Sequence, residues 1–66
     1  MSRNHDDYTK YPIDAVVQVY DIIDGWQECR IIKHDWDHVY GRPMFYVVLV
    51  NNTNISWITN SKYMRT

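Results

Sequence analysis

The pattern of hydrophobic and polar positions changes character at Pro12. Residues 1–11 are polar with scattered tyrosines and no periodicity, so we expect a flexible N-terminal arm there. From residue 12 onward the apolar residues are mainly β-branched or aromatic and come in short runs between turn residues, which is typical of β-strands. The sequence therefore predicts an arm over residues 1–11 and a single folded domain over residues 12–66.

The first two strands are predicted on either side of a tight turn. Residues 13–21 are rich in valine, and the dipeptide Asp24-Gly25 follows them. Asp-Gly is common in hairpin turns because both positions tolerate a positive φ. Residues 26–33 then alternate as a second strand would. One face of this strand is expected to carry Gln27, Cys29, Ile31 and Lys33.

The next segment combines a polar stretch with the strongest strand signal of the chain. Residues 34–43, HDWDHVYGRP, are polar and rich in turn-forming residues, so we predict a long loop. Residues 44–50, MFYVVLV, are an uninterrupted apolar run. Its length and its β-branched residues favour a strand over a helix, and we expect both of its faces to be at least partly covered.

The last part of the chain predicts two more short strands. Asparagine suits the left-handed conformations of turns, so residues 51–54, NNTN, are interpreted as a turn. Residues 55–59 alternate as a fourth strand, residues 60–61 are expected to form a turn or a single 3₁₀ twist, and residues 62–66 a closing strand. Five short strands with no helical segment predict an all-β fold, and closure into a small, partly open antiparallel barrel would remove exposed edges.

Composition narrows the class of protein. The chain has 66 residues, enough for one small domain, of which 45% are hydrophobic and 15% aromatic. Its net charge of −1 gives no support to binding that depends on phosphate contacts alone. The single cysteine, Cys29, excludes an internal disulfide. No apolar run approaches the ~20 residues that a helix needs to cross a bilayer, and the polar N-terminus does not resemble a signal peptide. We therefore expect an intracellular protein, cytoplasmic or nuclear, that is neither secreted nor in a membrane.

The order of these signals resembles one branch of the SH3-like domains. Residues 17–20, VQVY, precede residues 24–32, DGWQECRII, in which a turn leads into a tryptophan and a second strand. Residues 45–50, FYVVLV, are similar to the third strand of that branch. Trp57-Ile58, followed by Met64-Arg65, is similar to its ending. Together these pieces resemble the Tudor, chromo-barrel and Agenet domains.

The resemblance covers residues 13–66 and implies a five-stranded antiparallel SH3-like barrel that binds a partner and does not catalyse a reaction. Domains of this kind that read methylated lysine or arginine hold the cation over aromatic rings, each contact stabilising by roughly 0.5–2 kcal/mol. The turn after the third strand and the longer loop before it depart from the family pattern. The candidate ligand-binding residues that the resemblance implies are Tyr20, Trp26, Trp36, Tyr40, Tyr46 and Trp57.

Two other functions remain open from the sequence, beside the possibility that these aromatic residues simply form the core. A nucleic acid could bind if basic residues align on one rim next to exposed aromatic rings. That rim would consist of Arg30, Lys33, Arg42, Lys62 and Arg65. Alternatively, the chain could be a structural subunit that docks through an exposed strand edge, since an unclosed edge can pair with another chain, including a second copy.

Catalytic, metal and cofactor chemistry find little support. Residues 34–38, HDWDH, carry metal-capable side chains, but neighbours on one loop rarely converge on a single ion, so we expect a solvated loop and no metal. Cys29 lies within a predicted strand, where a free cysteine usually packs as a small hydrophobic residue. With only two glycines the chain has no glycine-rich phosphate loop. We predict no catalytic residues and no cofactor, and a protein or peptide as the first choice of partner.

Overall fold

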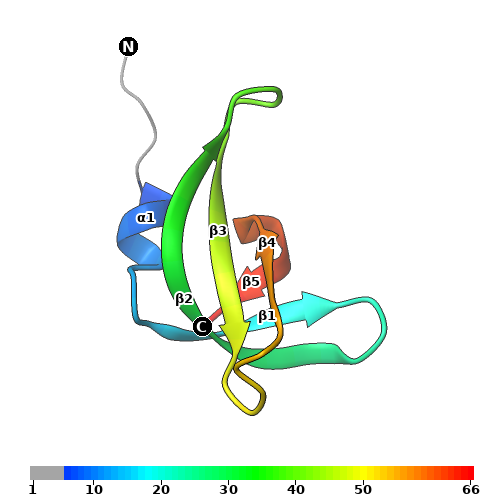
Figure 1. Ribbon diagram of the computed structural model, residues 1–66. Coiled ribbons are helices and arrows are strands. Elements are labelled where there is room, and N and C mark those ends of the chain that lie inside the picture. Colours follow the sequence, from blue (N-terminus) through cyan, green and yellow to red (C-terminus); the bar gives the residue numbers. More distant parts are fainter. Residues whose placement is uncertain (1–5) are drawn as a thin grey trace.

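The computed structural model describes residues 6–66, which form a short helix followed by one antiparallel sheet (Figure 1). The strands come from the β-branched and aromatic runs of the sequence, and turn residues separate them. The elements are α1 (Asp6–Lys10), β1 (Val16–Asp21), β2 (Gly25–Asp37), β3 (Arg42–Leu49), β4 (Ser56–Thr59), the 3₁₀ helix η1 (Ser61–Tyr63) and β5 (Met64–Arg65).

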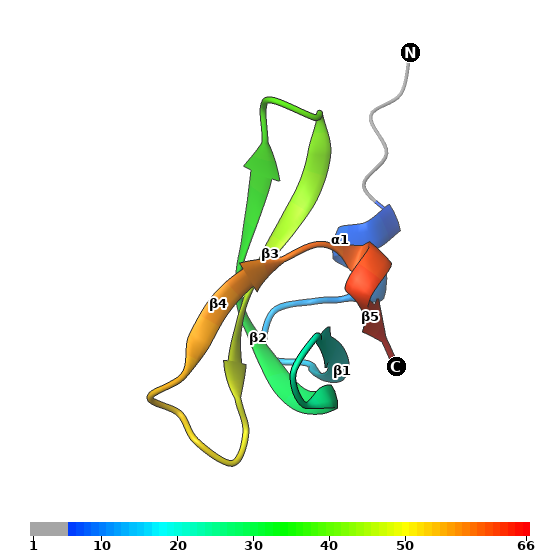
Figure 2. The ribbon, with the colours of Figure 1, turned by 90° about the vertical axis from the view of Figure 1, so that its right-hand side faces the viewer.

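All neighbouring strands of the five-stranded sheet are antiparallel, in the order β4-β3-β2-β1-β5. The predicted all-β class and antiparallel arrangement are confirmed. The sheet is open, because within residues 6–66 β4 and β5 are its two ends and do not pair with each other. Figure 2 shows how strongly the sheet curls, with β3 and β4 on one side and β1 and β5 on the other.

The long strand β2 connects the two halves of this curled sheet. Its first part pairs with β1 from Gly25 to Arg30, and its later part pairs with β3 from Cys29 to Asp37. A register shift between Ile31 and Lys33 leaves Ile32 as an extra residue in the strand. Such a bulge bends the strand and increases its twist. The expectation that Lys33 shares a face with Cys29 and Ile31 is wrong, because the bulge moves the exposed Lys33 to the opposite face.

The core lies on the concave side of the sheet and follows the alternation of the strands. Fully buried side chains come from β1, β2 and β3, where every second residue points inward. Cys29 is buried, as predicted, and packs as a small apolar side chain. The complete core cluster is Tyr11, Val17, Val19, Cys29, Ile31, Phe45, Val47 and Met64.

The segment before the domain contains a short helix and packs against the sheet. Residues 6–10 are helical, and Tyr11, which follows them, is only 3% exposed. Its hydroxyl donates to the carbonyl oxygen of Met64 at 3.3 Å, and its ring meets Phe45 edge-on. The Ser61 hydroxyl donates to Asp7 at 2.7 Å. Residues 6–11, which the sequence assigned to the arm, thus form a helix and contact the sheet, because tyrosines supply apolar area that so small a core needs. Residues 1–5 of the predicted arm lie outside the described part.

The predicted long loop over residues 34–43 is instead two strand ends and a short turn. β2 continues to Asp37 and β3 begins at Arg42. The Asp37 carboxylate accepts hydrogen bonds from the backbone N–H groups of Val39 and Tyr40 at 2.9 and 3.2 Å, which holds the turn. Polar composition suggested a loop here, but alternate polar residues suit a ribbon with exposed faces.

The C-terminal elements agree with the sequence in order but not in length. The expected 3₁₀ twist is present as η1, where the Asn60 side chain accepts a hydrogen bond from Lys62 N–H at 2.9 Å. η1 occupies part of the predicted closing strand, so β5 is limited to Met64 and Arg65. Of the residues described, none belongs to a helix with the length and apolarity needed to cross a membrane.

Candidate functional site

Two exposed aromatic rings lie side by side on the outer face of the first hairpin. Tyr20 and Trp26 are directly opposite each other in the β1–β2 register. Their ring centroids are 5.5 Å apart with an interplanar angle of 70°, an edge-to-face contact. Val19 points into the core, so alternation directs Tyr20 outward, where it is exposed together with Trp26. These rings therefore add little to the core and remain available at the surface.

Arg65 completes this surface from the last strand. Its guanidinium carbon lies 3.9 Å from the centroid of the Trp26 ring, a close cation–π contact. Its Nε donates to the side-chain oxygen of Gln18 at 2.6 Å, and β5 pairs Arg65 with Gln18. We call Gln18, Tyr20, Trp26 and Arg65 the Trp26 cluster. It joins three strands, so its geometry depends on the sheet and not on one loop.

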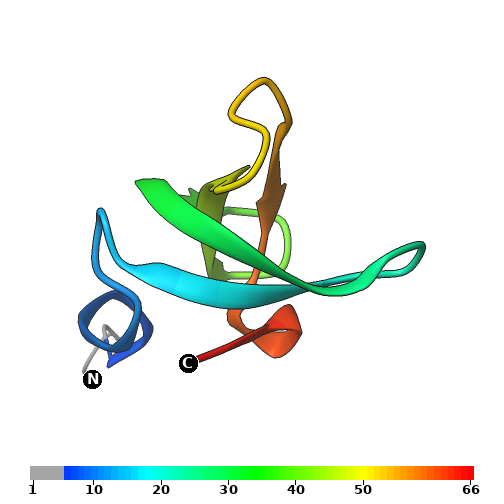
Figure 3. The same ribbon diagram turned by 90° about the horizontal axis from the view of Figure 1, so that it is seen from below.

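The tip of the same hairpin exposes two isoleucines. Ile22 and Ile23 are 86% and 84% exposed. The Asp21 carboxylate accepts a hydrogen bond from Ile23 N–H at 2.9 Å, and Gly25 has a φ of 76°, so polar and glycine residues shape the turn. Figure 3 shows this hairpin projecting beyond the rest of the sheet. The isoleucines contribute almost nothing to the fold and present apolar area to solvent.

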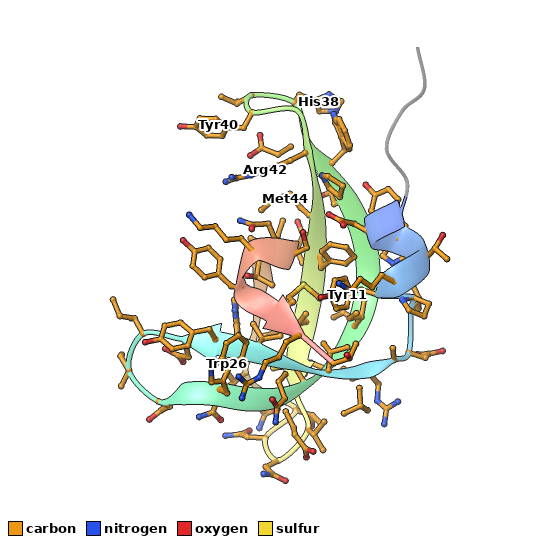
Figure 4. The ribbon with its side chains drawn as sticks, turned by 180° about the vertical axis from the view of Figure 1, so that it is seen from behind. Tyr11, Trp26, His38, Tyr40, Arg42 and Met44 are labelled. Atoms are coloured by element: carbon orange, nitrogen blue, oxygen red, sulfur yellow. The ribbon has the colours of Figure 1, made fainter. Side chains whose placement is uncertain are left out.

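The second hairpin carries its own aromatic residues, far from the Trp26 cluster. Figure 4 shows Tyr40 and Trp26 at opposite ends of the molecule. Tyr40 is exposed in the turn between β2 and β3, and the Arg42 guanidinium lies 5.1 Å from its ring centroid. Trp36 is half-buried near the same end, where it pairs with Pro43. These two predicted site residues therefore belong to a separate region.

The remaining predicted aromatic residues lie on different faces of the sheet. Tyr46 is on the outer face, with the Lys33 ammonium 5.2 Å from its ring centroid. Trp57 pairs with the buried Val47 and packs against the core. The structure thus brings Tyr20 and Trp26 into contact but does not gather the predicted aromatic set around one pocket.

The predicted basic rim is also dispersed, over β2, β3, η1 and β5. Arg30 donates to the backbone oxygen of Asp14 at 2.9 Å. Arg42 forms an ion pair with Asp37 at 3.8 Å, and Lys62 lies over the ring of Tyr63. Together with Lys33 over Tyr46 and Arg65 over Trp26, each basic residue has its own local partner.

Sequence reasoning missed three residues of this surface: Gln18, Ile22 and Ile23. The isoleucines had a detectable signal, because they stand between Asp21 and Asp24-Gly25 in a turn where polar residues are the rule. Gln18 had none, since its role depends on pairing with a strand at the other end of the chain.

The chemistry available to nucleophiles and metals is limited. Burial, with a smaller contribution from Asp21, raises the pKa of the Cys29 thiol to about 11, which removes the thiolate that a nucleophile requires at neutral pH. Residues 6–66 bring together no group of three or more His, Cys, Asp or Glu side chains able to hold a metal ion. His34 turns inward, where its Nε2 lies 2.8 Å from the Tyr11 carbonyl oxygen.

Comparison of the chain with protein-family models, curated proteins and solved structures finds no match.

Proposed function

We propose that this chain is a non-catalytic binding module that recognises a protein or peptide through the Trp26 cluster and the adjoining Ile22–Ile23 tip. One observation carries this proposal: Trp26 is 39% exposed while an edge-to-face contact with Tyr20 and the Arg65 guanidinium hold its ring in place. Tryptophan, tyrosine and arginine are the residues most enriched at energetic hot spots of protein interfaces. A ring that is already held in one position also loses less conformational entropy on binding than a mobile side chain would.

The two isoleucines favour a protein surface as the partner over a single methylated side chain. An apolar pair that projects from a hairpin can enter a pocket of the partner, and burial of each side chain would stabilise the complex by roughly 1.5–3 kcal/mol. A methylated lysine would need a free aromatic face, and Arg65 already lies over Trp26. Binding of a methylated lysine or arginine is therefore a more demanding version of the proposal, because Arg65 must first move away from the Trp26 ring.

The strand order supports the proposal that the fold is a Tudor-like, partly open SH3-like barrel. The sheet has five antiparallel strands in the order β4-β3-β2-β1-β5, is strongly curled (Figure 2) and has two unpaired ends within residues 6–66, which agrees with the five-stranded, partly open barrel that the resemblance implies. We propose that the ligand surface lies at the end of this barrel formed by the first hairpin.

Nucleic acid is the second candidate, and the Arg65–Trp26 stack is the observation that favours it. A base can stack on an exposed ring beside an arginine. The first hairpin carries three carboxylates, Asp21 at the end of β1, Asp24 in the turn and Glu28 on β2, and their charge would oppose phosphates. The charge around the hairpin therefore places this candidate second.

The test selects peptides from a random display library on the immobilised chain and measures their affinities for three variants. We expect Trp26→Ala and the Ile22→Ser/Ile23→Ser double variant to weaken the selected peptides at least about tenfold, a loss of 1.4 kcal/mol. Tyr40→Ala is the matched control, since it removes an exposed ring at the opposite hairpin. Loss of binding in Tyr40→Ala but not in Trp26→Ala would overturn the proposed surface.

Two further probes separate the alternatives. A trimethyllysine peptide and its unmethylated twin test the methylated ligand, which requires a clear preference for the first. A single-stranded oligonucleotide, titrated at low and at raised salt, tests the second candidate. Nucleic-acid affinity falls steeply with the logarithm of the salt concentration, whereas an apolar protein contact depends on it only slightly.

A further inference from the structure

The strand β4 forms one end of the sheet, and part of its backbone points away from β3. Leu49 N–H donates to the Ile55 carbonyl oxygen at 3.0 Å, which fixes the alternation of the strand. By that alternation Trp57 and Thr59 direct their backbone groups to β3, and Ser56 and Ile58 direct theirs to the free edge. Figure 2 shows no other element of residues 6–66 along that edge.

This edge lacks the features that usually prevent pairing with another chain. Natural edge strands carry lysine, proline or inward-pointing charges. Residues 55–59, ISWIT, contain neither a charged residue nor a proline, and both Ile55 and Ile58 are exposed. The opposite end of the sheet differs, because β5 has only two residues and one of them is Arg65. Of the two ends, only β4 offers an uncharged, apolar edge.

We propose that two copies of this chain pair antiparallel through their β4 edges, around a two-fold axis at Trp57. In this register Ser56 of each copy lies opposite the partner's Ile58, and both residues of the pair have outward-pointing N–H and C=O groups. Each pair can therefore exchange both of its backbone hydrogen bonds, which makes the edge self-complementary. Because this uncharged edge pairs with itself in this register, a second copy meets no like-charge repulsion, and a second copy is therefore the occupant that we propose.

The same register brings the two Trp57 side chains together. Residues at a non-hydrogen-bonded position of an antiparallel pair have Cα atoms about 4.5 Å apart and closely placed side chains. Trp57 is half-buried and packs against the core within one copy. Its remaining exposed area would be covered by the partner's Trp57, and Ile58 would be covered beside the partner's Ser56. A closed two-fold contact of this kind ends at the dimer.

Sedimentation equilibrium of the 66-residue chain tests the proposal. The concentrations run from about 10 µM to 1 mM, because a short edge implies weak association. We expect a dimer whose dissociation constant rises at least about tenfold in Ile58→Lys, where a cation must meet the opposite strand. The matched control is Ile32→Lys, because Ile32 is 47% exposed, close to the 42% of Ile58, but lies on the interior strand β2. A monomeric wild type throughout this range, or a dimer equally tight in Ile58→Lys, would overturn the proposal.

Cysteine cross-linking tests the register separately. An equal mixture of Ser56→Cys and Ile58→Cys should form a disulfide-linked dimer on mild oxidation, since a hydrogen-bonded pair has Cα atoms about 5.5 Å apart, within the range of disulfides. Each variant alone should cross-link much less, because neither residue faces its own copy. The native Cys29 is buried and does not compete. Equal cross-linking in the single variants would contradict the two-fold axis at Trp57.

Discussion

The Nε2 atom of His34 lies 2.8 Å from the backbone carbonyl oxygen of Tyr11, and this contact joins the later part of β2 to the residue that follows α1. The same imidazole stacks on Tyr8 at a centroid distance of 4.6 Å and meets Phe45 edge-on at 5.4 Å. The Tyr8 hydroxyl in turn donates to the carbonyl oxygen of Asp35. The N-terminal helix is thus fastened to the sheet through one histidine and two tyrosines.

Replacing His34 should loosen this attachment. We expect His34→Ala to lower the free energy of unfolding by about 1–3 kcal/mol, since it removes one hydrogen bond and one ring stack. Urea denaturation measures the loss, and amide exchange should accelerate in residues 8–11 more than in β3. His38→Ala is the control, because His38 is exposed in the second turn and should leave both measurements unchanged. Equal acceleration in β3 would show that His34 supports the whole core instead.

Stability should fall at alkaline pH because of Cys29. Burial raises the pKa of its thiol from 9.0 to about 11 in the folded chain, so between these values the unfolded chain loses its proton first. The stabilising contribution is complete below pH 9 and is lost as pH rises toward 11. Burial also raises the pKa of Tyr8, which acts in the same direction. Urea denaturation at stepped pH should give a shallower decline for Cys29→Ala.

The same burial predicts slow thiol labelling. A pKa of about 11 in place of 9.0 lowers the thiolate fraction at pH 8 about 100-fold, and enclosure in the core slows access further. A chromogenic disulfide reagent should therefore react slowly with the native chain and rapidly in urea. Rapid labelling without denaturant would contradict the buried position of Cys29.

The first turn should tolerate asparagine better than alanine at Gly25. Gly25 has a φ of 76°, and a Cβ atom added there would meet no heavy atom within 4 Å. The cost of substitution is therefore conformational, on the order of 1–2 kcal/mol for Gly25→Ala. Asparagine adopts this conformation more readily, so Gly25→Asn should cost less. Thermal denaturation of the pair decides the point, and equal losses would mean that the turn changes shape.

The Arg65–Trp26 contact should contribute modestly to stability. We expect a coupling energy of about 0.5–1 kcal/mol in a double-mutant cycle of Arg65→Ala and Trp26→Ala, the range for an exposed cation–π pair. Most of the loss on binding in Trp26→Ala would then reflect the missing ring and not an unfolded hairpin. A coupling above about 2 kcal/mol would instead indicate that the cluster is mainly structural.

Local sequence signals were sufficient for most of the fold. Asp24-Gly25 located the first turn, and the apolar run ending at Val50 located β3, because both depend on nearby residues. The bulge at Ile32 and the packing of Tyr11 against Met64 depend on contacts that form only in the folded chain. For this reason neither the face of Lys33 nor the packing of residues 6–11 against the sheet could be predicted from the alternation.

The candidate surface was predictable only in part. Tyr20 and Trp26 were brought together by a hairpin that the sequence revealed, so their contact followed from local pairing. Arg65 reached Trp26 through the pairing of β1 with β5, a contact between distant parts of the chain. Tyr40 was separated from them because the expected loop proved to be a continuation of two strands, which carries its turn away from the first hairpin (Figure 4).

The extra residue in β2 has an unusual consequence for changes in chain length. If Ile32 were deleted, the remaining residues would still alternate, with Ile31 inward, Lys33 outward and His34 inward, so no side chain would exchange faces. What the deletion would remove is the local bend, and a straighter ribbon would draw Ile31 and Phe45 out of their shared enclosure. In β2 the alternation of inward and outward side chains therefore depends on the regular strand residues, whereas the curvature depends on the one extra residue, Ile32.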